Sequence, residues 1–222
     1  MNNKVKQKYI LYHDQSREVL FEGWYYSIRE CVEHAVRKKI DLSGVDLRGQ
    51  NLCNANMDEA KMTGANCAGA NLNGANLSEG IFDHMDFSDA DLSNACFVLS
   101  SLSNVNFYGA SFGNTDMTDA IVMGCQFSCP SVFTTLFGRS AHFHDCHYTH
   151  DHRDYCALSR PPITVHGLAR DIVVMDDAIK IGNDIIRKHD LLSKGRLYFS
   201  TLYGEDITAF LIPVFHEKMH VA

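Results

Sequence analysis

Apolar side chains return at every fifth position of this chain between residues 40 and 129. Read in fives from Ile40, the sequence begins IDLSG VDLRG QNLCN ANMDE and continues for eighteen units without an insertion. The third residue of every unit is apolar, and the first is usually Ala or another small or β-branched residue. An α-helix repeats its apolar face about every 3.6 residues and a strand every second residue, so neither fits a period of five.

Each unit is predicted to be a very short strand followed by a corner. In extended backbone the first and third residues point to one side, and the second and fourth point outward. The corner falls at the fifth residue, where Gly and Asn dominate because they best tolerate a positive φ. The corner residues of these two types are Gly44, Gly49, Gly64, Gly69, Gly74, Gly109, Gly124, Asn54, Asn94, Asn104 and Asn114. Four corners close a coil of about twenty residues, so the sequence predicts an all-β solenoid.

Stacking of such coils makes a prediction about the core, because residues twenty apart are expected to lie over one another. One inner ladder is expected to contain Leu47, Cys67, Phe87, Phe107 and Phe127. Cys67 and Cys125 hold inward positions, so we interpret them as small apolar fillers with reduced thiols.

The stretch AKMTGANCAGANLNGANLSE resembles the A(D/N)LXX motif of the pentapeptide-repeat family. This resemblance implies a right-handed quadrilateral β-helix, which we assign to residues 40–148. The segments YILYHDQSREVLFEG and PPITVHGLARDIVVMDDAIKIG resemble phage-encoded members that have an N-terminal cap and a small C-terminal module. The resemblance ends at Asn183 and Asp184, where those relatives have Cys and then His, so no site involving that Cys is carried over.

Residues 1–39 are predicted to form a hairpin-helix cap, and residues 149–222 a linker and a small α+β C-terminal module. Two strand-like stretches flank the turn HDQSR, and Ser27 with Glu30 makes a capping box that starts a helix. This segment is expected to close the open end of the solenoid. In the last segment we expect strands at 163–168, 171–175 and 178–181, helices at 183–194 and 206–220, and an extended stretch at 197–202.

The charge is unevenly distributed along the chain. Residues 40–129 carry eleven Asp/Glu and two Lys/Arg, a net charge of −9, whereas residues 1–39 carry +3 and residues 130–222 carry −1. Such an acidic rod is a poor binder of nucleic acid or of an anionic membrane and suits a basic partner. No apolar run approaches the ~18 residues of a membrane span, and MNNKVKQKYI does not resemble a signal peptide. We therefore expect a cytoplasmic protein, in the host cytoplasm if it is phage-encoded.

The candidate partner-binding residues lie at the fourth and fifth positions of the units. They are Asp58, Glu59, Glu79, Asp83, Asp89, Val98, Leu99 and Asp119. By the twenty-residue count, the acids at 58, 59, 79 and 119 share one face, and Asp83 and Asp89 lie on neighbouring faces. Val98 and Leu99 replace the usual polar corner on the acidic face, and Tyr108, Ile121 and Met123 are further outward apolar residues. A solvated charged surface, or packing of Val98 and Leu99 against the C-terminal segment, is the alternative interpretation.

The segment HFHDCHYTHDHRDYC, residues 142–156, is the metal-like constellation of the sequence. Zinc needs three or four ligands converging as a tetrahedron, and the candidates are His142, His144, Cys146 and His147. Their spacing matches no standard zinc finger, so we favour a His-rich surface. The common nucleotide-binding, zinc-protease and hydrolase motifs are missing, and a filled solenoid offers no pocket, so we expect neither catalysis nor a cofactor.

The leading hypothesis is non-enzymatic protein binding by the acidic β-helix. Resemblance to gyrase-protecting pentapeptide-repeat proteins and to phage relatives implies a DNA-handling host protein as partner, engaged by DNA mimicry. The first alternative is a structural scaffold or homo-oligomer, for example a homodimer through the C-terminal module. The second is a metal or small-ligand binder at residues 142–156.

Overall fold

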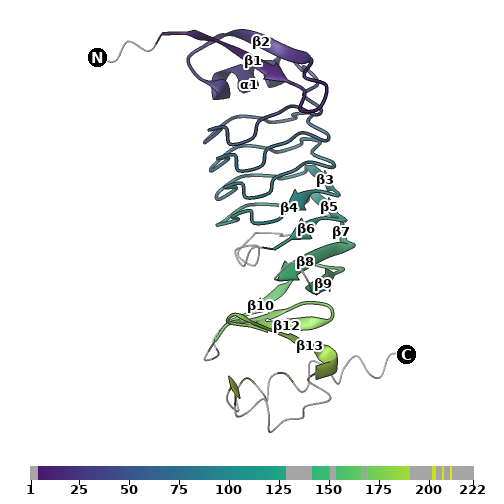
Figure 1. Cartoon of the computed structure of the whole chain (residues 1–222). Coiled ribbons are helices and arrows are strands. Elements are labelled where there is room, and N and C mark those ends of the chain that lie inside the picture. The colour runs from purple at the N-terminus through teal and green to yellow at the C-terminus, as the bar shows by residue number, and fades with distance from the viewer. Residues whose placement is uncertain are drawn as a thin grey trace. The chain divides into compact units, whose positions relative to one another are not determined.

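The computed structural model describes residues 5–128, 142–150, 154–166, 168, 170–190, 202, 203, 207 and 211. The chain divides into two compact units, Met1–Tyr155 and Cys156–Ala222. In the first unit a hairpin and a helix are followed by a stack of coils (Figure 1). No helix within these residues has the length and apolar composition needed to cross a bilayer.

A hairpin that packs on a helix precedes the repeats. Strand β1 (Gln7–Tyr12) pairs antiparallel with β2 (Val19–Tyr25), and helix α1 (Ile28–Arg37) follows. Ser27 caps the helix by accepting a hydrogen bond from the backbone N–H of Glu30 at 3.2 Å. The Glu30 carboxylate in turn accepts one from the backbone N–H of Tyr26 at 3.1 Å. The predicted hairpin and capped helix are therefore confirmed.

The end of the hairpin is attached to the first coil. The backbone N–H of Asp46 donates to the carbonyl of Tyr12 at 2.8 Å, and that of Asp14 donates to the carbonyl of Gly44 at 2.7 Å. Arg48 adds ion pairs to Asp14 at 2.9 Å and to Asp46 at 2.8 Å. Backbone and charge together fix the hairpin on the solenoid.

The repeats form coils of twenty residues with four five-residue sides. Parallel bridges join residues twenty apart, for example Asp46 to Asn66, Asn66 to Asp86 and Asp86 to Asn106. Every fifth-position residue from Gly44 to Gly124 has a positive φ, between 55° and 72°. The residue after each corner closes a turn, as when the N–H of Val45 donates to the carbonyl of Leu42 at 3.0 Å. The predicted β-helix solenoid and its corners are confirmed.

The third-position side chains fill the core. All eighteen of them, from Leu42 to Phe127, are 1% exposed or less. The Phe87 and Phe107 rings are stacked at 5.6 Å between centroids, and Phe107 and Phe127 at 5.2 Å, as the twenty-residue count predicted. Burial raises the pKa of the Cys67 thiol to about 12, which is consistent with an inert filler.

The later coils contain enough extended backbone to be strands. These are β3 (Ser101–Ser103), β4 (Asn106–Phe107), β5 (Ile121–Met123), β6 (Gln126–Phe127), β7 (His142–His144), β8 (Cys146–His150) and β9 (Asp154–Leu158). They form two sheets, with orders β3-β5-β7 and β4-β6-β8-β9. Ile121 pairs with His142 and Gln126 with His147, a spacing of twenty-one residues. One residue is therefore added to the twenty-residue repeat before the coil that contains Tyr148.

The second unit contains a four-stranded antiparallel sheet in chain order. Its strands are β10 (Ile163–Val165), β11 (Ile172–Val174), β12 (Ala178–Ile181) and β13 (Asp184–Arg187). The core of the unit combines Ile172, Ile179, Ile181 and Ile186 with Ile207 and Leu211.

The prediction of a helix from residue 183 is wrong at its start. Gly182, with φ +59°, and Asn183 make a two-residue turn, so that Ile179 pairs with Ile186 across a hairpin. Leu202 is helical, where an extended stretch was predicted, and most of the helix predicted at 206–220 lies outside the described residues.

Candidate functional site

Most acids and amides at the second position of the units have a structural role. Their side-chain oxygens accept a hydrogen bond from the backbone N–H two residues later, for example from Ser43 to Asp41 at 3.0 Å and from Ser93 to Asp91 at 3.0 Å. Each bond satisfies a backbone donor ahead of a corner. Hydrogen bonding from Arg48 also lowers the pKa of Asp46 to about 2. These carboxylates add to the acidity of the rod, but their positions are explained by the fold.

One column of corners carries the residues that the fold does not require. The backbone N–H of Glu59 donates to the carbonyl of Ser78, that of Glu79 to Val98 and that of Leu99 to Thr118, at 2.9, 2.9 and 3.2 Å. These bonds place Glu59, Glu79, Leu99 and Asp119 above one another, and all four side chains are exposed. Asp58 and Val98 lie one residue earlier and are half-buried, while Asp89 is on another corner column, beside Gly109.

Leu99 is exceptional within this column. Its φ is +61°, and its side chain is 58% exposed. Among the described residues it is the only apolar side chain with a positive φ. The left-handed conformation costs a residue with a Cβ roughly 1–2 kcal/mol, and Gly or Asn would reduce that cost. The protein therefore holds a leucine in strained backbone and leaves it in water.

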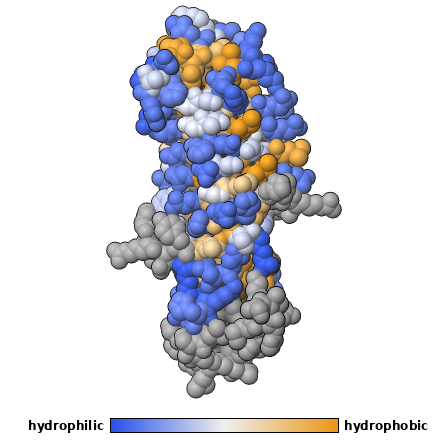
Figure 2. All heavy atoms as spheres, turned by 90° about the vertical axis from the view of Figure 1, so that its right-hand side faces the viewer, coloured by the Kyte–Doolittle hydropathy of each residue, from blue (hydrophilic) through white to orange (hydrophobic). Residues whose placement is uncertain are grey.

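Three further apolar residues lie on the side of the coils that begins at this corner. They are Ile81, Ile121 and Met123. Ile81 bridges to Ser101, and Ser101 pairs with Ile121, so Ile81 and Ile121 lie in one row with Ser101 between them. Ile81 is 43% exposed, and Ile121 and Met123 are partly exposed. Figure 2 views this side and shows apolar atoms among hydrophilic ones at mid-height. Sequence analysis missed Ile81, although it occupies a second position where Asp or Asn is usual.

We call this surface the Leu99 edge and define it as Glu79, Ile81, Asp83, Leu99, Asp119, Ile121 and Met123. Its acids differ in accessibility. Asp83 accepts hydrogen bonds from the Ser101 hydroxyl at 2.8 Å and from the Ser103 backbone at 3.1 Å, so it caps the next coil. Glu79 and Asp119 are exposed and take part in no ion pair among the described residues. Glu59, just beyond the edge, is paired with Lys39.

The geometry separates the candidate metal ligands on β7 and β8. Cys146 is 1% exposed and points into the core, where its thiol approaches the carbonyl of Val122 at 3.6 Å. His147 points to solvent, and His144 pairs with the Asp145 carboxylate at 2.8 Å. The side chain of His142 lies outside the described residues. In the described part of the chain, no three His, Cys, Asp or Glu side chains are grouped to hold a metal ion.

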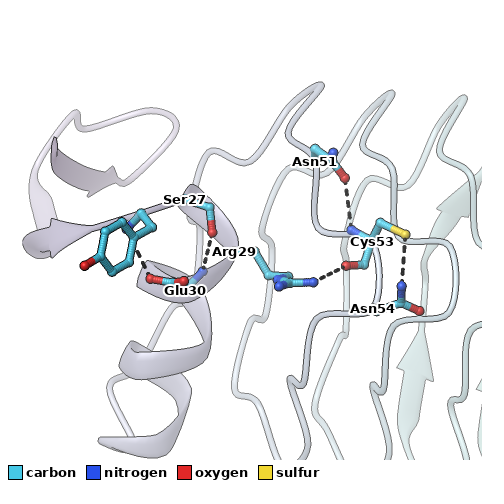
Figure 3. Close-up of a pocket in the computed structure, with 7 residues that line it drawn as sticks. Ser27, Arg29, Glu30, Asn51, Cys53 and Asn54 are labelled. Carbon is cyan, nitrogen blue, oxygen red and sulfur yellow. Dashed lines mark hydrogen bonds between the residues drawn. The ribbon is translucent and has the colours of Figure 1, made fainter. Parts of the chain in front are cut away.

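An open groove of about 610 Å³ lies between the first turn of α1 and the coils (Figure 3). Its lining consists of Tyr26, Ser27, Arg29, Glu30, Asn51, Cys53 and Asn54. The Arg29 guanidinium donates to the carbonyl of Cys53 at 3.1 Å, and Asn51 accepts from the N–H of Cys53 at 3.2 Å. The Arg29 bond joins the helix to the solenoid, whereas the Asn51 bond lies within the coil. Sequence analysis did not predict the groove, since it arises only when the helix docks.

Comparison with known proteins agrees with the coil geometry. The family described as pentapeptide repeats matches residues 40–78 and 86–122, in eight copies. The chain contains a pentapeptide-repeat domain. No curated protein matches the sequence.

Several solved structures resemble the pentapeptide-repeat domain. HetL, a pentapeptide-repeat protein involved in heterocyst differentiation regulation in the cyanobacterium Nostoc, is 22% identical over 40% of this chain and 46% of its own, with a TM-score of 0.35. A pentapeptide-repeat protein of the Arabidopsis thaliana thylakoid lumen is 31% identical over 43% of this chain and 70% of its own, with a TM-score of 0.23. QnrB1, a plasmid-mediated fluoroquinolone resistance protein, is 15% identical over 47% of this chain and 63% of its own, with a TM-score of 0.19. The match thus spans less than half of HetL.

Proposed function

We propose that this protein acts by binding another protein through the Leu99 edge. The observation that carries the proposal is Leu99 itself, because an apolar side chain in strained backbone, 58% exposed, lowers the stability of the free protein. The coil imposes this conformation at every corner, so it is the use of leucine there, instead of glycine or a polar residue, that calls for a functional explanation. A partner that covers Leu99, Ile81 and Ile121 would recover the free energy of burying them.

The chemistry of the edge defines the partner. Glu79 and Asp119 flank the apolar residues, and the repeats around them carry a net charge of −9. The complementary surface therefore has apolar groups at its centre and Lys or Arg at its rim. Rim charges of this kind increase the association rate and make it sensitive to salt, whereas the apolar centre supplies most of the affinity.

DNA mimicry is the second candidate function, with a DNA-binding enzyme such as gyrase as partner. The acidity of the rod favours it. Mimicry of a phosphate row needs evenly spaced negative charge, however, and the corner column breaks at Leu99, while Glu59 is paired with Lys39. We therefore rank the mixed apolar and acidic contact first.

A passive scaffold is the remaining alternative. In that function the hairpin and α1 close one end of the solenoid, self-association occurs through the C-terminal module, and the coils act as a spacer. The scaffold needs no partner at the Leu99 edge, so the strain at Leu99 would have no purpose. If the protein is a passive scaffold, substitutions in the Leu99 edge should leave partner capture unchanged.

Affinity capture from a bacterial lysate with three immobilised baits tests the proposal. The baits are the wild type, Leu99→Asn, and the double variant Glu79→Gln with Asp119→Asn, each washed at low and at high salt. We expect Leu99→Asn to lose the captured protein at both salt concentrations. The charge variant should still capture it, but the amount captured should depend less on salt than with the wild type. DNA mimicry predicts the reverse, with Leu99→Asn unaffected and wild-type capture abolished by salt. Identical capture by all three baits would refute both.

A further inference from the structure

Among the described residues of the first unit, the hairpin of β1 and β2 is covered on one face only. Its inner face rests on α1, where the Tyr25 hydroxyl bonds to Nδ1 of His34 at 2.7 Å and the Phe21 ring meets the same imidazole edge-on at 5.7 Å. Leu11, on that face, is 1% exposed. Figure 1 shows α1 between the hairpin and the coils. The opposite face of this two-stranded sheet is therefore turned away from the rest of the first unit.

The outer face combines apolar residues with one charge of each sign. Lys8 pairs with Trp24 and Ile10 with Glu22 across the two strands, so these four residues share a face. Trp24 is 64% exposed, and Ile10 is partly exposed. Lys8 and Glu22 form an ion pair at 3.0 Å beside them. A large aromatic residue with this exposure is a typical anchor of a protein interface.

From this pattern we infer that the outer face of the hairpin binds the same face of a second copy of the chain. The face is electrically self-complementary. In a two-fold contact, Lys8 of one copy meets Glu22 of the other, and each Trp24 covers the apolar residues of its partner. Lys8 and Glu22 pair within each hairpin, and the two-fold contact brings the pair of one copy beside the oppositely oriented pair of the other, so every charge stays next to an opposite one when water is excluded.

The size of the face sets the strength of the contact. Two strands of six and seven residues give a surface about 20 Å long and 10 Å wide. That is well below the roughly 800 Å² per partner of a standard interface, so the dimer is weak and depends on concentration. Its two-fold symmetry closes the assembly at two chains. This contact is independent of the Leu99 edge, which lies on the coils.

Trp24 is the single tryptophan of the chain, so its fluorescence reports directly on this face. The test combines sedimentation velocity over a concentration series with tryptophan emission and acrylamide quenching of the full chain. We expect the sedimentation coefficient to rise with concentration while the emission shifts to shorter wavelength and quenching decreases. Trp24→Ala, which removes little from the folded monomer because the side chain is exposed, should weaken dimerisation about tenfold or more.

Charge reversal provides the second arm. Lys8→Glu should weaken the dimer, and the double variant Lys8→Glu with Glu22→Lys should restore it, with circular dichroism showing that each variant is folded. Leu99→Asn is the matched control and should dimerise like the wild type, which separates this inference from the proposed function. A monomer at all concentrations overturns the inference. So does a dimer that persists in Trp24→Ala while wild-type emission stays constant, since that dimer uses another surface.

Discussion

The rings of Phe87 and Phe107 lie parallel, 5.6 Å apart at their centroids with 3° between their planes, although twenty residues separate them in the chain. Phe127 continues the stack at 5.2 Å and 8°. A ring can stack on its neighbour in this way only if each coil repeats the path of the one before it. The contact therefore reports both the length of the coil and its register.

Truncation of the middle ring should be strongly destabilising. Phe107 is fully buried and contacts Phe87, Phe127 and Phe112. We expect Phe107→Ala to lower the free energy of unfolding by about 3–5 kcal/mol, because a cavity replaces contacts on both sides. Urea denaturation measures the change. Ser111→Ala, an exposed substitution on the next side of the coil, serves as the control and should change stability by less than about 0.5 kcal/mol.

Substitution of two corner glycines distinguishes the cost of backbone strain from the cost of disturbing the docked hairpin. Gly44 and Gly49 both have a positive φ, of 70° and 63°. A Cβ on Gly49 would meet nothing within 4 Å, whereas one on Gly44 would lie 2.2 Å from Nε2 of His13. We expect Gly49→Ala to cost about 1 kcal/mol from strain alone. Gly44→Ala should cost about 1–3 kcal/mol more, because the His13 loop must move. Equal losses in thermal denaturation would contradict the attachment described for the hairpin.

The ion pairs of Asp46 should make stability depend on pH in acid. Its pKa is lowered to about 2, first by hydrogen bonding from Arg48, and Arg17 also contacts the carboxylate at 3.0 Å. A depressed pKa stabilises the fold above the ordinary Asp value near 4, and this stability is lost as the pH falls through about 2. We expect Asp46→Asn to cost about 1 kcal/mol at pH 7 and only a small part of that near pH 2, in denaturation curves across this range.

The matched control is Asp116→Asn. Asp116 accepts the backbone N–H of Thr118 at 2.9 Å and has no ion pair among the described residues. Asparagine makes the same bond at Asn66, so neither substitution removes the local turn. A pH profile of Asp116→Asn that matches that of Asp46→Asn would mean that the ion pairs are not the cause.

The repeat fold was predictable because its signal is local and repeated. Each five-residue unit contains both the inward apolar positions and the corner residue. Eighteen units with the same pattern exclude a helical or a simple strand period. In the C-terminal unit, each strand or helix has its own sequence pattern that is not repeated, so a misread element is not corrected by its neighbours. Ile185 and Ile186 were read as part of a helix, whereas the preceding Gly182 and Asn183 form a tight hairpin turn that pairs them with β12.

The candidate site was predictable only in part. The twenty-residue count placed Glu59, Glu79, Leu99 and Asp119 in one column, because the count follows from the fold. Whether an acid is accessible depends on contacts that the count does not contain, such as the pairing of Glu59 with Lys39 and the capping of the Ser103 backbone by Asp83. The positive φ of Leu99 follows from its corner position in the repeat, but its 58% exposure became known only from the structure.

Relief of that strain should stabilise the protein. The corner at Asn94, one side earlier in the same coil, has φ +58°. We expect Leu99→Asn to raise the free energy of unfolding by about 1 kcal/mol and the melting temperature by about 2–4 °C. Asn94→Leu should lower stability by a similar amount, since it places leucine in the same conformation. A loss of stability in Leu99→Asn would show that Leu99 contributes to packing within the chain.

The most direct measurement sets stability against binding for the two variants. Melting temperature and lysate capture are measured on the same preparations of wild type, Leu99→Asn and Asn94→Leu. The account predicts that Leu99→Asn melts higher and loses the captured partner, whereas Asn94→Leu melts lower and retains it. Capture that follows stability, or that is the same for all three proteins, would contradict the assignment of the Leu99 edge as the binding surface.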